Sequence, residues 1–171
     1  MSAGKKRAGL LSWFLTLCAM ACMFLLDQGC KYLAISKLRG KPPVRIISGI
    51  LELDYVENTG MAFGLMTGRP FFLAAVSVVF IVAGLFILNR FLADRRMWPA
   101  AVCLTVILAG AAGNMYDRIF RGMVIDYISF VLIRFPVFNL ADCFVVVGTL
   151  MLCVLLLFYF SEEDLAGWKR N

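Results

Sequence analysis

Two aspartates, Asp126 and Asp142, offer the chemistry that this sequence can perform. They flank a mostly apolar segment, in a chain that otherwise keeps acids away from its hydrophobic runs. An ionisable side chain at membrane depth is costly, so each acid is a functional-site hypothesis. Two neighbouring carboxylates cannot both ionise readily, so one keeps a proton while the other acts as a base. Such a pair can activate water and protonate a leaving amine.

Polar residues near the two acids predict where they meet. Asn114 and Arg118 are four residues apart, and Asn139 and Asp142 are three apart, so each pair shares one face of a helix. Asp126 lies in the segment that connects these two helix ends. We therefore expect both acids to meet at the outer membrane interface.

A structural role is the alternative for every acid in this region. In this role the acids pair with Arg118, Arg121 or Arg134 and hold the loops in place, because a carboxylate beside a guanidinium stays ionised. We favour that role for Asp117, which is next to Arg118, and the catalytic role for Asp126 and Asp142.

The elements that position these residues follow from composition. Of 171 residues, 62% are hydrophobic and 16% are charged, which is far outside the range of soluble domains. We expect one all-α membrane domain over residues 1–171: a four-transmembrane-helix bundle with a small extracytoplasmic β-sheet and an interfacial loop segment. The predicted spans cover residues 10–27, 70–90, 97–117 and 140–160.

Charge predicts the orientation of the bundle. An even number of spans puts both termini on one side, and Lys5, Lys6 and Arg7 argue that this side is the cytoplasm. Residues 32–69 and 118–139 are then extracytoplasmic. When the basic residues of all the loops are counted, the two sides of the membrane carry equal numbers, so this wider count does not decide the orientation. The N-terminus imitates a secretory signal, but three more spans follow, so we expect it to be retained.

The two outer segments differ in pattern. In the first, residues 40–43 (GKPP) end any helix that continues from the first span, and residues 51–55 (LELDY) alternate like a half-buried strand with one wet face. In the second, residues 123–138 are too interrupted to span, so we expect an interfacial or re-entrant segment there.

Several classes of function are disfavoured. The net charge of +6 comes from basic residues beside the spans, which favours anionic lipid head groups over nucleic acid. The chain has no histidine, so a Ser-His or Cys-His site is excluded and we expect no metal and no cofactor. Five cysteines in or beside the spans are interpreted as small core residues: Cys18, Cys22, Cys103, Cys143 and Cys153.

Five short blocks resemble, in order and spacing, the signature blocks of lipoprotein signal peptidase, the type II signal peptidase of bacteria. They are DQGCK (27–31), NTGMAF (58–63), GNMYDR (113–118), VIDY (124–127) and FNLAD (138–142). They extend over nearly the whole chain. One departure is Cys30, at a place where the family commonly has Ser or Thr.

The resemblance implies a membrane aspartic endopeptidase. Such an enzyme of the inner membrane removes the signal peptide from diacylglyceryl-modified prolipoproteins, cleaving before the lipidated cysteine. It implies Asp126 and Asp142 as the catalytic dyad, with a site at the extracytoplasmic face. We expect a monomer that contacts membrane lipids. The supporting residues that it implies are Asp27, Lys31, Asn58, Gly60, Asn114, Arg118 and Asn139.

The supporting blocks also have physical uses of their own. Asn58 and Gly60 suit a turn in which the glycine permits close approach of the backbone. The Asn58 amide could hold a substrate carbonyl, and a plain loop turn is the alternative. Asp27 and Lys31, at i and i+4, are expected to neutralise each other. The small residues at 109–113 favour close helix packing.

Two rival functions remain at this point. One is a proton-coupled transporter or channel subunit with a relay formed by Asp27, Asp117, Asp126 and Asp142. A relay should distribute acids through the membrane, whereas all four fall at the predicted outer ends of spans. The other is a non-catalytic assembly factor, which predicts a site mutant that still functions.

Overall fold

Four long helices and a small sheet make up the described chain. The computed structural model describes residues 8–61, 65–133 and 135–164. The helices are α1 (Leu10–Leu38), α2 (Pro70–Ala93), α3 (Trp98–Phe120) and α4 (Leu140–Phe158), and the strands are β1 (Val44–Ile47), β2 (Leu51–Asn58) and β3 (Val124–Phe130). A short 3-10 helix, η2 (Arg95–Met97), precedes α3. Residues Lys5, Lys6, Arg7, Ala62, Phe63 and Arg134 lie outside the described residues.

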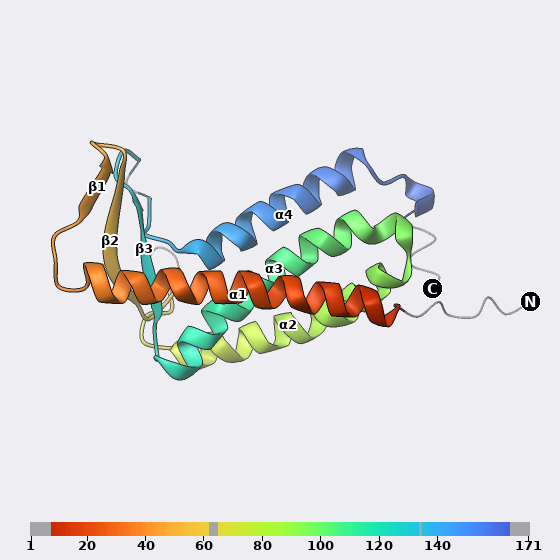
Figure 1. Cartoon of the computed structure of the whole chain (residues 1–171), viewed down its shortest axis with the longest axis horizontal. Coiled ribbons are helices and arrows are strands. Elements are labelled where there is room, and N and C mark those ends of the chain that lie inside the picture. Colours follow the sequence, from red (N-terminus) through yellow and green to blue (C-terminus); the bar gives the residue numbers. More distant parts are fainter. Residues whose placement is uncertain (1–7, 62–64, 134, 165–171) are drawn as a thin grey trace, which may run out of the picture.

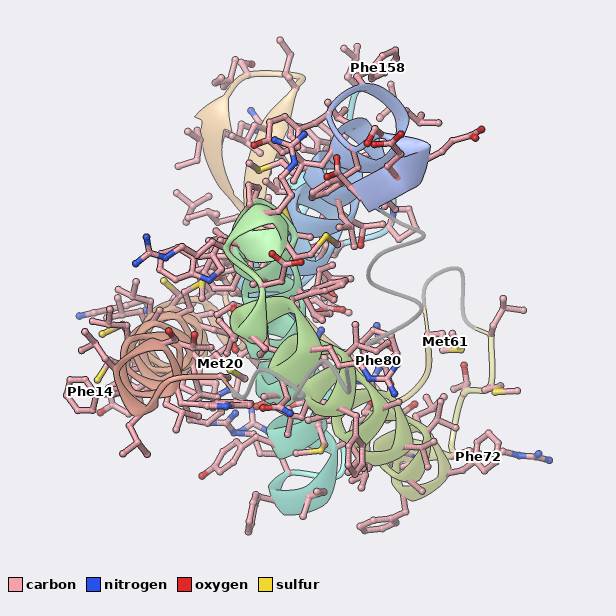
Figure 2. All side chains as sticks on the ribbon, turned by 90° about the vertical axis from the view of Figure 1, so that its right-hand side faces the viewer. Phe14, Met20, Met61, Phe72, Phe80 and Phe158 are labelled. Atoms are coloured by element: carbon pink, nitrogen blue, oxygen red, sulfur yellow. The ribbon has the colours of Figure 1, made fainter. Side chains whose placement is uncertain are left out.

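The helices have the length and surface of membrane spans. All four are long and apolar enough to cross a bilayer, with mean hydropathies from 1.5 to 2.9. Large apolar side chains cover the outside of the bundle, and Figure 2 shows Phe14 and Phe158 pointing away from it. Such a surface is compatible with lipid and costly in water. The chain is therefore a multi-pass membrane protein, which confirms the predicted fold class.

The bundle has two distinct ends. The three strands lie together at one end, whereas α1 begins and α4 ends at the other (Figure 1). At the end away from the sheet, the buried core includes Leu88, Met97 and Leu108. At the sheet end, a second cluster joins Ala34 and Leu38 of α1 to β3.

Helix α1 extends beyond its predicted span. Its buried residues after the midpoint are Asp27, Lys31, Ala34 and Leu38. This spacing of four, three and four residues forms one stripe, so the helix stays folded by packing after the uncharged run ends. The helix ends just before Gly40, which has a φ of 70°. The breaker cluster at 40–43 therefore ends the helix as expected.

Helix α3 is the central helix of the bundle. In its most apolar 18-residue segment, 61% of the residues are buried, against 11% in the corresponding segments of α1 and α4. A side chain at Gly113 would lie 2.5 Å from Asp27 Oδ2, and one at Gly110 would collide with the Ala141 carbonyl oxygen. The small residues of α3 thus allow α1 and α4 to approach closely, which confirms the packing role predicted for 109–113.

The sheet has the order β1-β2-β3, with both pairs antiparallel. The strand predicted over 51–55 lies within β2, but both of its faces are half-buried, so the expected wet face is absent from these residues. Strand β3 comes from the segment expected to be interfacial. Its register pairs Val56 with Asp126 and Asn58 with Val124. This pairing brings the end of β2 beside Asp126.

The cysteines differ from their interpretation as core residues. Cys103 is buried, but Cys18, Cys22 and Cys153 are exposed, and Cys143 is half-buried. Because lipid is as apolar as a protein core, a thiol on a span can face outward at little cost. The core interpretation is therefore wrong for the three exposed cysteines.

Candidate active site

The first turn of α4 fixes Asp142. Asn139 is the N-cap residue, and its side chain accepts a hydrogen bond from the Asp142 backbone N–H at 3.0 Å. In return, Asp142 Oδ2 accepts the Asn139 backbone N–H at 3.1 Å. This reciprocal capping box satisfies two otherwise free donors of the helix end and restricts the Asp142 side chain.

Asp126 lies on β3 and reaches the same helix end. Its Oδ1 accepts Asn139 Nδ2 at 2.6 Å, and its Oδ2 accepts Asn58 Nδ2 at 2.9 Å. The residue is only 2% exposed. Burial raises the pKa of Asp126 to about 6, and the nearby Asp142 charge contributes to the rise. The hydrogen bonds from the two asparagines oppose it.

Asn114 completes the bridge between the two acids. Its Nδ2 donates to Asp142 Oδ1 at 2.7 Å, and its Oδ1 accepts Asn139 Nδ2 at 3.1 Å. The Asn139 amide therefore contacts both Asp126 and Asn114, which in turn contacts Asp142. Asp126, Asn139, Asn114 and Asp142 thus form one hydrogen-bonded frame, in which the two asparagines connect the two carboxyl groups.

The two acids open onto one cavity of about 570 Å³. Its other polar lining residues include Asn58, Asn114 and Arg118. Most of the lining is apolar, and that part includes Phe130, Ile133, Phe135, Val137, Phe138, Val146 and Val147. An apolar pocket with a few convergent polar groups is the usual form of a ligand site.

Arg118 connects α3 to the loop after β2. Its Nη2 donates to the Gly60 carbonyl oxygen at 3.0 Å, and its Nη1 donates to the Asn114 carbonyl oxygen at 3.3 Å. Gly60 is tightly enclosed, since an added Cβ would lie 2.6 Å from the Leu65 carbonyl oxygen. The close backbone approach expected at Gly60 is therefore present.

Asn58 forms the turn expected of it. Its Oδ1 accepts the Gly60 backbone N–H at 2.9 Å, while its Nδ2 donates to Asp126. In this structure the amide therefore orients a candidate catalytic acid, rather than standing free for a substrate carbonyl.

A cluster of buried charged side chains lies next to this hydrogen-bonded frame. Lys31 Nζ is 2.8 Å from Asp27 Oδ2 and 2.7 Å from Asp117 Oδ2. Asp117 also pairs with Arg121. The expected Asp27–Lys31 pair is thus confirmed. Of the arginine partners expected for these acids, Arg121 pairs with Asp117, because it is one turn away on the same helix face, whereas the adjacent Arg118 points elsewhere.

Sequence reasoning missed Gln28. Gln28 Nε2 donates to Asp27 and Asp117 at 3.1 and 3.3 Å, and its Oε1 accepts Arg121 Nη1 at 2.9 Å. Arg121 was among the expected partners, and its i, i+4 spacing from Asp117 was the signal that favoured it over Arg118. Gln28 carries no such signal, since Asp117 and Arg121, its partners outside α1, are distant in the sequence.

Cys30, the residue that departs from the family signature, packs against the cluster that contains Tyr127. Burial raises the pKa of the Tyr127 hydroxyl on β3, and the nearby Cys30 thiol adds to the rise. Within the described ranges, no three Asp, Glu, Cys or His side chains gather as a metal site would need. The frame of acids and asparagines is the chemistry that this cavity presents.

Known proteins resemble this chain in sequence and in fold. Residues 19–158 match the family described as signal peptidase (SPase) II. The lipoprotein signal peptidase of Clostridioides difficile (strain 630) is 38% identical over 139 residues, covering 81% of this chain and 91% of that protein. The lipoprotein signal peptidase of Caldicellulosiruptor bescii (strain ATCC BAA-1888 / DSM 6725 / KCTC 15123 / Z-1320) is 39% identical over 140 residues, covering 82% and 89%.

A solved structure supports the fold independently. A bacterial membrane enzyme superposes with a TM-score of 0.75 at 23% identity, covering 90% of this chain and 92% of that one. The sequence match extends over most of the chain and includes both Asp126 and Asp142, so the chain belongs to the signal peptidase II family of membrane peptidases.

Proposed function

We propose that this protein is a membrane aspartic endopeptidase that removes the signal peptide from diacylglyceryl-modified prolipoproteins. Cleavage occurs just before the lipidated cysteine, and Asp126 and Asp142 form the dyad that activates water. Family membership supports the reaction class, since the relatives are lipoprotein signal peptidases. The assignment of the dyad rests on the geometry of the site.

One observation supports the assignment of Asp126 and Asp142 as the dyad. Two carboxyl groups from different elements, β3 and α4, line one largely apolar cavity and share a frame of asparagine amides. A frame in which Asn139 holds both Asp126 and the helix end of Asp142 keeps the acids at a fixed separation. Positioned acids of this kind provide general acid and base together.

The proposed chemistry uses one proton on the pair. We assign this proton to Asp126, because burial raises its pKa to about 6. Asp142 takes a proton from the attacking water, while Asp126 donates its proton to the scissile carbonyl oxygen. The resulting tetrahedral gem-diol then collapses: its C–N bond breaks, the leaving nitrogen receives a proton from the dyad, and a hydroxyl proton returns to the pair.

The cavity wall supports an apolar substrate beside the membrane. Phe130, Phe135 and Val146 are among its lining residues. A signal segment bound against them excludes bulk water from the acids, which strengthens the interactions in the site and favours the protonated form of Asp126. The lipid chains of the substrate remain in the bilayer.

We further propose the cellular arrangement. The protein lies in the bacterial inner membrane as a single domain over residues 1–171, with both termini in the cytoplasm and the site at the extracytoplasmic face. In support, α1 begins and α4 ends at the end opposite the sheet (Figure 1). Membrane lipids cover its apolar outer surface, and it acts as a monomer, since one chain provides both acids and the cavity.

The direct test is cleavage by the purified protein. A diacylglyceryl-modified prolipoprotein is incubated with it, and mass spectrometry locates the cut. We expect a new N-terminus at the lipidated cysteine. The matched control is the same precursor without the diacylglyceryl group. Equal cleavage of both precursors, or a cut elsewhere, contradicts the proposed specificity.

A further inference from the structure

Lys31 makes one contact that neutralising acids does not require. Its side chain is fully buried between α1 and α3. Besides the two ion pairs with Asp27 and Asp117, its Nζ donates a hydrogen bond to Asn114 Oδ1 at 3.0 Å. Three oxygens thus surround an ammonium group that has three donors. The third oxygen belongs to the residue that binds Asp142.

The charges of the cluster already cancel without this contact. Lys31 and Arg121 are positive, and Asp27 and Asp117 are negative. Asp27 also accepts the Ala141 backbone N–H at 3.0 Å. Ion pairing therefore explains why Lys31 is tolerated in a buried place, but not why it faces Asn114.

The ammonium decides which way the Asn114 amide points. An ammonium donates and cannot accept, so Asn114 must present its oxygen to Lys31. The same oxygen accepts Asn139 Nδ2, which leaves Asn114 Nδ2 to donate to Asp142 at 2.7 Å. A reversed amide would instead place its oxygen against a carboxylate oxygen of Asp142, and two acceptors would face each other.

We propose that Lys31 is a positioning residue of the proposed catalytic dyad. It fixes the direction of the hydrogen bonds from Lys31 to Asn114 to Asp142, and so holds the Asp142 carboxylate in its working orientation. This inference rests on the proposed function. It assigns to the buried cluster a part in catalysis, exerted through Asn114, in addition to its part in folding.

The test separates positioning from charge balance. Lys31→Met alone leaves an uncompensated buried acid, so it is combined with Asp27→Asn, which returns the cluster to neutrality. Where this pair fails to fold, Lys31→Met with Asp117→Asn serves instead, since it also cancels the charge. The matched control is Lys37→Met, at an exposed lysine of the same helix.

We expect the neutral double variant to fold and to bind substrate with an unchanged KM, but to lose at least about tenfold in kcat. Lys37→Met should retain wild-type kcat. In an Asn114→Ala background, the same double substitution should cause no further loss, because Lys31 then has no amide to orient. An effect transmitted through Ala141 would persist in that background.

Two results overturn the inference: a neutral double variant with kcat within twofold of wild type, or equal losses with and without Asn114. Failure of the proposed function is a different result. It is tested with the Asp142→Asn variant, in which Lys31 is intact. Full cleavage by that variant would contradict the assignment of Asp142 to a catalytic dyad.

Discussion

Replacing Asp126 by asparagine should favour the folded state more at neutral pH than at acidic pH. Burial raises the pKa of Asp126 from 3.8 to about 6, so the folded protein holds a proton that the unfolded chain has released. Between these two values the folded state binds more protons, and the free energy of unfolding falls as the pH rises. Stability is fully present below the unfolded pKa and is lost as the pH passes the folded one.

The size of the effect follows from the two pKa values. At about 1.4 kcal/mol for each pH unit between them, ionising Asp126 in the fold costs about 3 kcal/mol. The introduced asparagine has no charge to bury, although one of the two asparagine donors then faces an amide nitrogen instead of an oxygen. That loss does not depend on pH. Between pH 4 and pH 8, the stability difference should therefore move by about 2 to 3 kcal/mol in favour of Asp126→Asn.

Reversible unfolding in mixed detergent micelles, measured at both pH values, gives this difference. Glu163→Gln is the control, because Glu163 is exposed at the other end of the bundle. Its stability difference from wild type should stay nearly constant with pH. A constant difference for Asp126→Asn as well, or one that moves in favour of wild type, would refute the reasoning about burial.

Two further predictions concern the loop and the cavity. Gly60→Ala should lower the free energy of unfolding by about 1 to 3 kcal/mol, because the new Cβ meets the Leu65 carbonyl oxygen, whereas Gly29→Ala, with open space around it, should not; equal thermal stability of the two variants would argue against a tight loop. A variant whose single cysteine is Cys143 should lose cleavage after labelling with a bulky maleimide, because Cys143 lines the cavity. A variant with only the exposed Cys153 should keep cleavage after the same labelling, and full activity of labelled Cys143 would mean that substrate does not occupy this cavity.

Helical spacing was enough to predict much of the site. Asn139 and Asp142 share a face because they are three residues apart, and the structure joins them in a capping box. The long uncharged runs likewise predicted four spans. These features depend on local periodicity, which a single sequence contains.

Features that depend on contacts between distant segments were missed. Strand β3 (VIDYISF) is largely buried, so it lacks the alternation that reveals a half-exposed strand. Asn139 was expected to support the site, but its bond to Asp126 depends on how β3 meets α4. The direction of the Asn114 amide depends on Lys31 of another helix. No spacing within one segment contains that information.

The central claim is that Asp126 and Asp142 together activate water. Its most direct test measures single-turnover cleavage of a diacylglyceryl-modified prolipoprotein by purified Asp126→Asn and Asp142→Asn, each first shown to be folded. An amide keeps the shape of the carboxyl group but cannot exchange its proton. The account predicts that both variants remain folded and that neither cleaves at a measurable rate. Cleavage at the wild-type rate by either folded variant would contradict it.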